Sequence, residues 1–345
     1  MSTVQTEQTK SQSAKASDIF SALSRIRELP VMVALVALVL GTFLLNPRFL
    51  NSQSVKDLQL NATIVIILAA GQAVVLITRN VDLSVGSILG LSGFTTGTLF
   101  AVAPGIPIWL VFVIGVAVGG LLGAFNGLLV TTARVPALVI TLGTLYIYRG
   151  INNAWAGGKE YFSGDRPKAF GNLSVDTFFG LPIITIMAIV VVGVLAVALG
   201  RTRQGRDLYA IGSEPEAARL FGIAVGPRVF VAFLINGMLA GLGGVLYASR
   251  FSSVGASTGT GLELDVVAAA VVGGVAIFGG VGSVVGAAIG ALLLTTITSS
   301  LTAIQVDKFW QQAVVGVLIL AAIIVDRIAS LRRARRLREG GDSDE

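Results

Sequence analysis

Apolar stretches of about 20 residues follow one another along almost the entire chain, and they limit its possible folds more than any other feature. The hydrocarbon core of a bilayer is ~30 Å thick, which an α-helix crosses with ~20 apolar residues. Hydrophobic residues make up 54% of the 345 residues, charged ones 13%, and the mean hydropathy is +0.84. A soluble protein could not bury so many long apolar segments. We therefore expect an all-α polytopic membrane protein.

Hydropathy, with breaks at Gly and Pro, predicts ten membrane-crossing helices. With the N-terminus inside, 17 Lys and Arg residues lie on the inner side and seven on the outer side. This asymmetry agrees with the positive-inside rule and places both termini in the cytosol. The polar residues 1–29 are expected to form a disordered cytosolic tail, 30–328 the transmembrane domain, and 329–345 a second cytosolic tail. The expected spans are 30–46, 58–78, 86–103, 106–131, 135–155, 181–200, 228–248, 264–280, 283–303 and 309–326.

A charged loop, 201–228, interrupts the apolar chain on the inner side. Ser213 and Glu216 have the spacing of a capping box, Pro215 fits the first turn, and Gly222 is placed to end the helix. Such a helix has about eight residues and is ~12 Å long, too short to persist alone in water. An apolar stripe must hold it, either against a soluble partner or against its own membrane domain. The residues of this candidate docking helix are Ser213, Glu216, Ala217, Ala218, Leu220, Phe221 and Gly222.

Polar residues at membrane depth are candidates for a solute pathway. Residues 78–87 lie between two apolar runs, and Asp82 or Ser84 can cap the second of them. One interpretation is a cap at the membrane edge, with Arg79 reaching the surface. The other is a broken helix that lines a cavity, where irregular backbone is tolerated. Further candidates, suited to an uncharged polyhydroxy ligand or to hydrogen bonds between helices, are Asn126, Thr141, Thr144 and Arg149.

The chain lacks the residues that several classes of catalytic and metal chemistry require. The chain has no Cys and no His, which removes disulfides, thiol chemistry, the commonest general base and the commonest ligands of transition metals, so we expect no metal site. A phosphate-binding loop is absent, because Gly157-Gly-Lys159 is followed by Glu160. The five arginines of 331–338 directly follow a span, and we interpret them as an anchor at the lipid surface and not as a nucleic-acid site. No catalytic site is expected.

Glycine recurs every fourth residue in several spans, for example at Gly115, Gly119, Gly123 and Gly127. The same spacing relates Gly237 to Gly241. Small residues at this spacing let helix backbones approach closely in lipid. We expect these glycines to pack helices and not to bind a ligand.

Several segments taken together resemble the permease subunits of bacterial ABC importers for monosaccharides, the family of the ribose permease. The resemblance lies in segments 75–87, 135–150, 205–223, 261–274 and 278–283. Three short sequence stretches are more similar to the rhamnose and autoinducer-2 permeases. They are Thr-Arg-Asn-Val-Asp at 78–82, Trp-Ala-Gly-Gly at 155–158 and Thr-Gly-Thr-Gly-Leu-Glu at 258–263.

The resemblance implies a type II-like importer permease in a bacterial plasma membrane. It implies a second permease subunit of the same or a related chain, cytosolic ATPase subunits, an extracytoplasmic sugar-binding protein and no cofactor. The 201–228 loop then carries the coupling helix that docks on the ATPase, and the expected solute is a monosaccharide or similar molecule. Alternatives are an ABC permease for ribose, a nucleoside or a branched-chain amino acid, or an ion-coupled secondary transporter.

Overall fold

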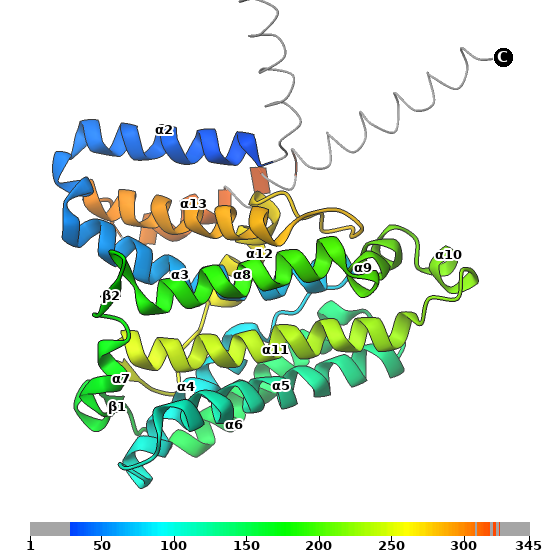
Figure 1. Cartoon of the computed structure of the whole chain (residues 1–345), viewed down its shortest axis with the longest axis horizontal. Helices are drawn as coiled ribbons and strands as arrows, with labels where there is room; N and C mark the ends of the chain where they lie inside the picture. Colours follow the sequence, from blue (N-terminus) through cyan, green and yellow to red (C-terminus); the bar gives the residue numbers. More distant parts are fainter. Residues whose placement is uncertain (1–27, 308, 318–319, 322–323, 325–345) are drawn as a thin grey trace, which may run out of the picture.

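The computed structural model describes residues 28–307, 309–317, 320–321 and 324, and it consists mainly of α-helices (Figure 1). The helices are α2 (Leu29–Leu45), α3 (Ser52–Ile77), α4 (Val85–Val102), α5 (Ile108–Thr132), α6 (Ala137–Ala156), α7 (Lys168–Asn172), α8 (Ile183–Arg201), α9 (Arg203–Ser213), α10 (Pro215–Leu220), α11 (Val225–Arg250), α12 (Leu262–Val272) and α13 (Val284–Ala303), with 3₁₀ turns η1 (Pro47–Leu50) and η2 (Ser163–Asp165). The strands are β1 (Tyr161–Phe162), β2 (Thr177–Phe178), β3 (Leu181–Pro182) and β4 (Ser253–Val254).

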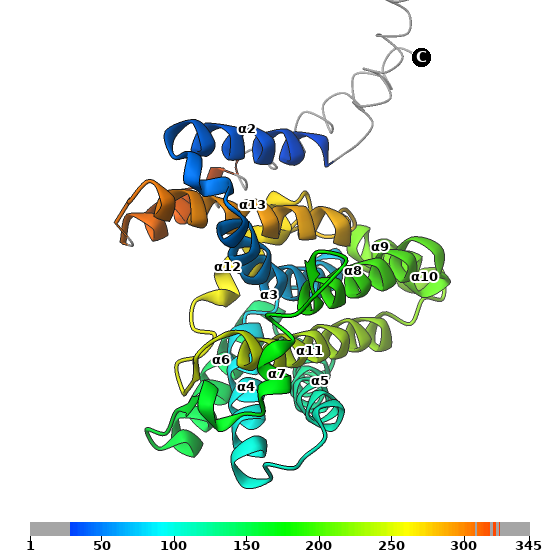
Figure 2. The same ribbon diagram turned by 60° about the vertical axis from the view of Figure 1, so that its left-hand side comes forward.

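The long helices lie side by side in layers (Figures 1 and 2). α2 lies at one edge against α13, α3 and α8 occupy the middle, and α11, α5, α4 and α6 form the other side. α9 and α10 project at one end, which we call the α10 end. The four short strands and α7 gather at the opposite end, which we call the hairpin end.

Glycine repeats pack α5 against α11, as the sequence predicts. A Cβ on Gly119 would overlap the carbonyl oxygen of Gly237, and a Cβ on Gly241 would overlap that of Gly115. The two backbones are therefore in direct contact, an approach that only small residues allow where lipid provides no hydrophobic drive between helices. This pair forms the rigid wall against which α4 packs.

Six helices in the described part of the chain are long and apolar enough to cross a membrane, namely α3, α4, α5, α8, α11 and α13. α6 and α2 cover the expected spans 135–155 and 30–46, but α6 is more polar and α2 has 17 residues. The span 309–326 lies partly outside the described residues, as do almost all of the two predicted tails. The total of ten crossings stays a prediction.

The expected span 264–280 is wrong as a single helix. α12 has 11 residues, which corresponds to ~16 Å, about half of the bilayer core. Residues 273–283 continue without helix, because glycines there adopt left-handed backbone conformations that a helix does not contain. Hydropathy does not detect this break, since the segment remains apolar. The glycines with positive φ are Gly274, Gly279, Gly280 and Gly282.

Residues 157–182 cover the hairpin end. β1 pairs antiparallel with β4, and β2 pairs with β3 in a tight hairpin. Phe170 of α7 is fully buried, with its ring 4.8 Å from that of Phe100. The segment is thus attached to the ends of α4 and α11.

Candidate functional site

The charged loop contains two helices, α9 and α10, and the predicted capping box is absent. Ser213 is the last residue of α9, and its hydroxyl donates to the Tyr209 carbonyl oxygen at 3.0 Å. Glu214 occupies the N-cap of α10 without a side-chain capping bond. Pro215 explains the break, because the residue before a proline is forced out of the helical region, and Glu214 has φ −155° and ψ 99°. Glu216 pairs instead with Arg219 at 2.8 Å.

α9 is fixed to the membrane domain on several sides. Asp207 forms an ion pair of 2.9 Å with Arg228, just inside α11. The Tyr209 hydroxyl donates to the Gly282 carbonyl oxygen at 3.0 Å. Leu208 and Ile211 are buried in the core. A displacement of α9 must therefore move α11 and the 273–283 segment with it.

α10 presents its largest apolar side chains to the outside. Ala218 is 4% exposed and packs in the core, whereas Leu220 is 90% and Phe221 86% exposed. Leu220 and Phe221 therefore do not hold the helix to the described part of this chain, and their docking on a soluble partner stays a prediction. Ala218, with half-buried Ala217, holds the helix on this chain. As the sequence predicts, Gly222 ends the helix, and its backbone adopts a left-handed conformation with φ +80°.

Asp82 lies at the centre of a buried network between helices. Its Oδ1 accepts from the Ser84 amide at 2.9 Å and from the Ser84 hydroxyl at 2.7 Å, and its Oδ2 accepts from the Asn236 amide at 3.0 Å. Asn126 donates to the Ser84 hydroxyl at 2.7 Å, and Tyr148 donates to Asn126 at 2.9 Å. Asn236 lies about 16 Å along α11 from its start, so the network is well inside the bundle.

This network joins residues from α5, α6, α11 and the non-helical segment 78–84. With its amide turned so that both atoms find partners, Gln72 of α3 pairs with the Asp82 backbone, donating at 3.2 Å and accepting at 3.1 Å. Ser84 stands at the N-cap of α4, but its side chain makes no capping bond to the helix. The carboxylate of Asp82 therefore pins the entry into α4 from within the helix bundle, and its place along a solute pathway stays a prediction.

The other candidates on α6 contact two different segments. The Thr141 hydroxyl donates to the Val81 carbonyl oxygen at 3.2 Å, and the Thr144 hydroxyl to that of Thr141 at 3.2 Å. Arg149 donates to the Thr258 carbonyl oxygen at 2.6 Å and lies apart from the Asp82 network. The loop 255–261, which holds Arg149, separates β4 from α12 and lies against the first turns of α4.

Sequence reasoning missed the network residues Gln72, Tyr148 and Asn236. An amide inside a long apolar run is a usable signal, since such residues are rare in spans and usually find a polar partner. Gln72 and Asn236 both carry that signal. The pairing with Asp82 could not be predicted, because the partners lie 10 and 154 positions away in the chain.

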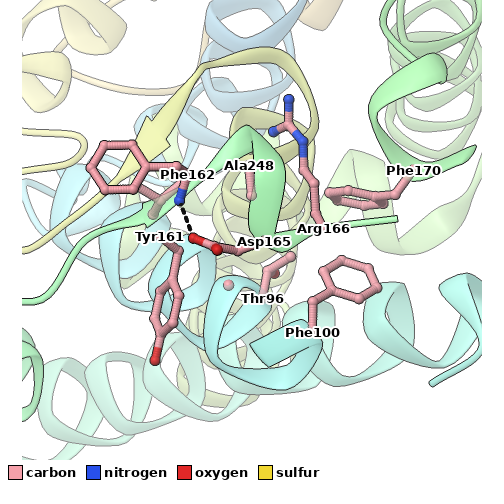
Figure 3. Close-up of a pocket in the computed structure, with 10 residues that line it drawn as sticks. Thr96, Phe100, Tyr161, Phe162, Asp165, Arg166, Phe170 and Ala248 are labelled. Atoms are coloured by element: carbon pink, nitrogen blue, oxygen red, sulfur yellow. Dashed lines mark hydrogen bonds between the residues drawn. The ribbon is translucent and has the colours of Figure 1, made fainter. Parts of the chain in front are cut away.

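The cavity shown in Figure 3 lies at the hairpin end and is too small for a solute. It measures about 10 Å³, enough for one water molecule. Asp165 accepts from the Phe162 amide at 2.7 Å, and Arg166 points away from it to donate to the Phe251 carbonyl oxygen at 2.9 Å. Burial lowers the pKa of the Arg166 guanidinium from its ordinary value. These groups tie the 157–182 segment to the bundle.

Two of the larger hollows face outward and are apolar. One of about 750 Å³ lies between α5 and α11, and one of about 500 Å³ lies beside α8. Neither offers the hydroxyl, amide or charged groups that a polyhydroxy solute needs. Within the described residues, no group of three or more carboxylates is close enough together to hold a metal ion.

Comparison with known families identifies the class of protein. A family model described as the permease component of the branched-chain amino acid transport system matches residues 55–323. The chain belongs to this permease family. The match includes the Asp82 network, the charged loop and the non-helical segment 273–283. The protein is thus an integral inner-membrane protein, and its homologues are subunits of transport systems.

Individual relatives match nearly end to end. The autoinducer 2 import system permease protein LsrC of Enterobacter sp. (strain 638) is 39% identical over 319 residues, 92% of each chain. The LsrC proteins of Escherichia coli O9:H4 (strain HS) and Klebsiella pneumoniae subsp. pneumoniae are each 37% identical, over 90% and 92% of both chains. No solved structure matches.

Proposed function

We propose that this chain is the membrane-spanning permease subunit of an ABC importer for autoinducer 2 or a closely related small polyhydroxy solute. The observation that carries the proposal is the 39% identity, over 92% of both chains, with a permease named for autoinducer 2 import. The apolar tip of α10 supports it. An exposed Leu–Phe pair on a short helix is suited to a groove of a soluble partner, and the chain lacks a phosphate-binding loop of its own.

In this proposal the α10 end faces the cytosol and the hairpin end faces outward. ATPase subunits bind α10, an extracytoplasmic binding protein delivers the solute at the hairpin end, and a second permease subunit completes the pathway. ATP-driven closure of the ATPase subunits pushes on α10 and rocks the helices between outward- and inward-facing states. This subunit binds and conducts the solute and catalyses no reaction.

Asp82, Ser84, Asn126, Thr141, Thr144 and Arg149 are proposed to border the solute pathway. Asp82 and Ser84 act by fixing segment 78–84, since both are fully buried in hydrogen bonds. Arg149 donates to backbone oxygens of the 255–261 loop, interacts electrostatically with the Glu263 carboxylate, and remains half-buried. A charged donor placed in this way is suited to the hydroxyl groups of a neutral solute.

The orientation can be tested with single cysteines, because the chain has no native cysteine. Ser163→Cys lies at the hairpin end and Ser213→Cys at the α10 end, and both positions are exposed. We expect an impermeant thiol reagent to label Ser163→Cys in intact cells with the outer membrane opened. Ser213→Cys should be labelled only after the inner membrane is opened as well. The reverse pattern would contradict the proposed orientation.

The solute can be tested by uptake in cells that lack their own permease. Co-expressed with an ATPase subunit and a binding protein, the chain is expected to import autoinducer 2, and excess unlabelled autoinducer 2 should compete. Ribose and rhamnose are expected to compete weakly. Import of leucine in place of autoinducer 2 would show that the chain belongs with the amino acid permeases of its family.

A further inference from the structure

Three glycines bring α9 into backbone contact with two non-helical segments of the membrane domain. A Cβ on Gly212 would overlap the carbonyl oxygen of Ile77, the last residue of α3, and the amide of Gly280. A Cβ on Gly279 would lie 2.8 Å from the Arg79 amide and 2.9 Å from the Gly212 carbonyl oxygen. The Gly280 amide itself donates to the Ile77 carbonyl oxygen at 2.9 Å. We call Gly212, Gly279 and Gly280 the glycine junction.

α10 is joined to this junction with little freedom. Glu214 alone separates the two helices, and its amide donates to the Ala210 carbonyl oxygen of α9 at 3.1 Å. The Tyr209 hydroxyl adds the bond to Gly282 on the other side of the junction. A force applied to α10 therefore reaches backbone atoms directly, without flexible side chains between them.

Both non-helical segments lead from the junction to α6. Segment 78–84 begins where α3 ends at the junction and accepts a bond from Thr141 through Val81. Segment 273–283 contains two of the junction glycines and continues back through α12 to the loop that holds Arg149. α6 thus receives contacts from both routes, at positions two turns apart, and α4 is contacted by the same segment and loop at its first turns.

We infer that the glycine junction is the positioning element through which movement of α10 is passed to α6. This inference rests on the proposed function, because the force on α10 comes from the ATPase. Close-packed interiors transmit displacement because they have few voids to absorb it. Backbone contact without a Cβ gives the closest packing that two segments can have. Any added side chain at Gly212 separates α9 from both segments at once.

The test compares Gly212→Ala with Gly226→Ala, a glycine at the start of α11 with open space around its Cβ position. Each variant carries a reporter cysteine, Asn153→Cys, on the exposed side of α6. The complex with its ATPase subunit is purified, and the rate of labelling by a maleimide is measured with and without ATP plus vanadate. In the parent and in Gly226→Ala, ATP is expected to change the labelling rate.

In Gly212→Ala the ATP-dependent change in rate is expected to shrink about tenfold, while the same amount of ATPase subunit co-purifies. Tyr209→Phe removes the bond to Gly282 without adding volume, and it should shrink the change about two- to fivefold. If Gly212→Ala does not accumulate in the membrane, Tyr209→Phe tests the role of the junction in its place. A structural defect alone would lower the amount of complex and leave the response of the surviving complex intact.

The contrary outcomes distinguish a failure of the inference about the glycine junction from a failure of the proposed function. The inference is overturned if Gly212→Ala and Tyr209→Phe keep the parent's response to ATP, or if the parent binds its ATPase and shows no response at Asn153→Cys. Failure of the parent to bind any ATPase subunit would overturn the proposed function itself.

Discussion

Replacing Leu220 or Phe221 with aspartate is expected to abolish ATPase docking and import without lowering the amount of permease in the membrane. The two side chains are 90% and 86% exposed, so they contribute little to the folding of this chain. In an apolar groove of a partner, an unpaired carboxylate would have to lose its water. Apolar anchors at interface centres contribute ~2 kcal/mol or more, which corresponds to a loss of about 30-fold in affinity. The amount of ATPase subunit that co-purifies with the permease measures this loss of affinity.

The matched control in the same helix is Arg219→Ala. Arg219 forms an exposed ion pair with Glu216, and such pairs contribute ~0–1 kcal/mol. ATPase recovery from this variant should stay near that of the parent. Ala218→Glu is unsuitable as a test of docking, because Ala218 is buried in its own chain and a buried charge would disturb the loop. Wild-type ATPase recovery from both aspartate variants would show that α10 is not the docking element.

The class of fold and the place of the loop could be predicted because they depend on composition over long windows. Apolar runs and the distribution of Lys and Arg each average over many residues, so single exceptions matter little. The helix boundaries inside the loop depend on individual residues. Ser213 fits a capping box by spacing, yet Pro215 forces Glu214 out of the helix, and Ser213 becomes the end of α9.

The break in the helix after α12 shows a second limit on what can be predicted from the sequence. Apart from Asp265, residues 264–280 are apolar, and the sequence does not reveal whether a glycine in such a run packs a helix or ends it. The glycines of α5 and Gly212 of α9 pack within helices, whereas Gly279 and Gly280 interrupt one. Only contacts with distant segments, such as the bond from the Gly280 amide to the Ile77 carbonyl oxygen, separate the two cases.

Replacing Asp82 with alanine is expected to reduce import much more than it reduces the amount of permease in the membrane. The change leaves three buried donors without an acceptor, the Ser84 amide, the Ser84 hydroxyl and the Asn236 amide. Each costs roughly 1–3 kcal/mol in a buried site. The helices of the bundle keep their own packing, so the change is expected to displace segment 78–84 without unfolding the protein. Uptake per permease molecule should fall at least about tenfold.

Asp82→Asn separates hydrogen bonding from charge. The amide oxygen can still accept from Ser84, and the amide nitrogen can donate to the Asn236 side-chain oxygen, which is buried without a partner in the native network. A turn of the Asn236 amide is enough to make that bond. If the carboxylate acts by pinning the entry into α4, Asp82→Asn should keep most of the uptake that Asp82→Ala loses. Equal loss in both variants would mean that the negative charge itself is needed, as in an ion-coupled transporter. Unchanged uptake per molecule in Asp82→Ala would reduce Asp82 to a local structural role.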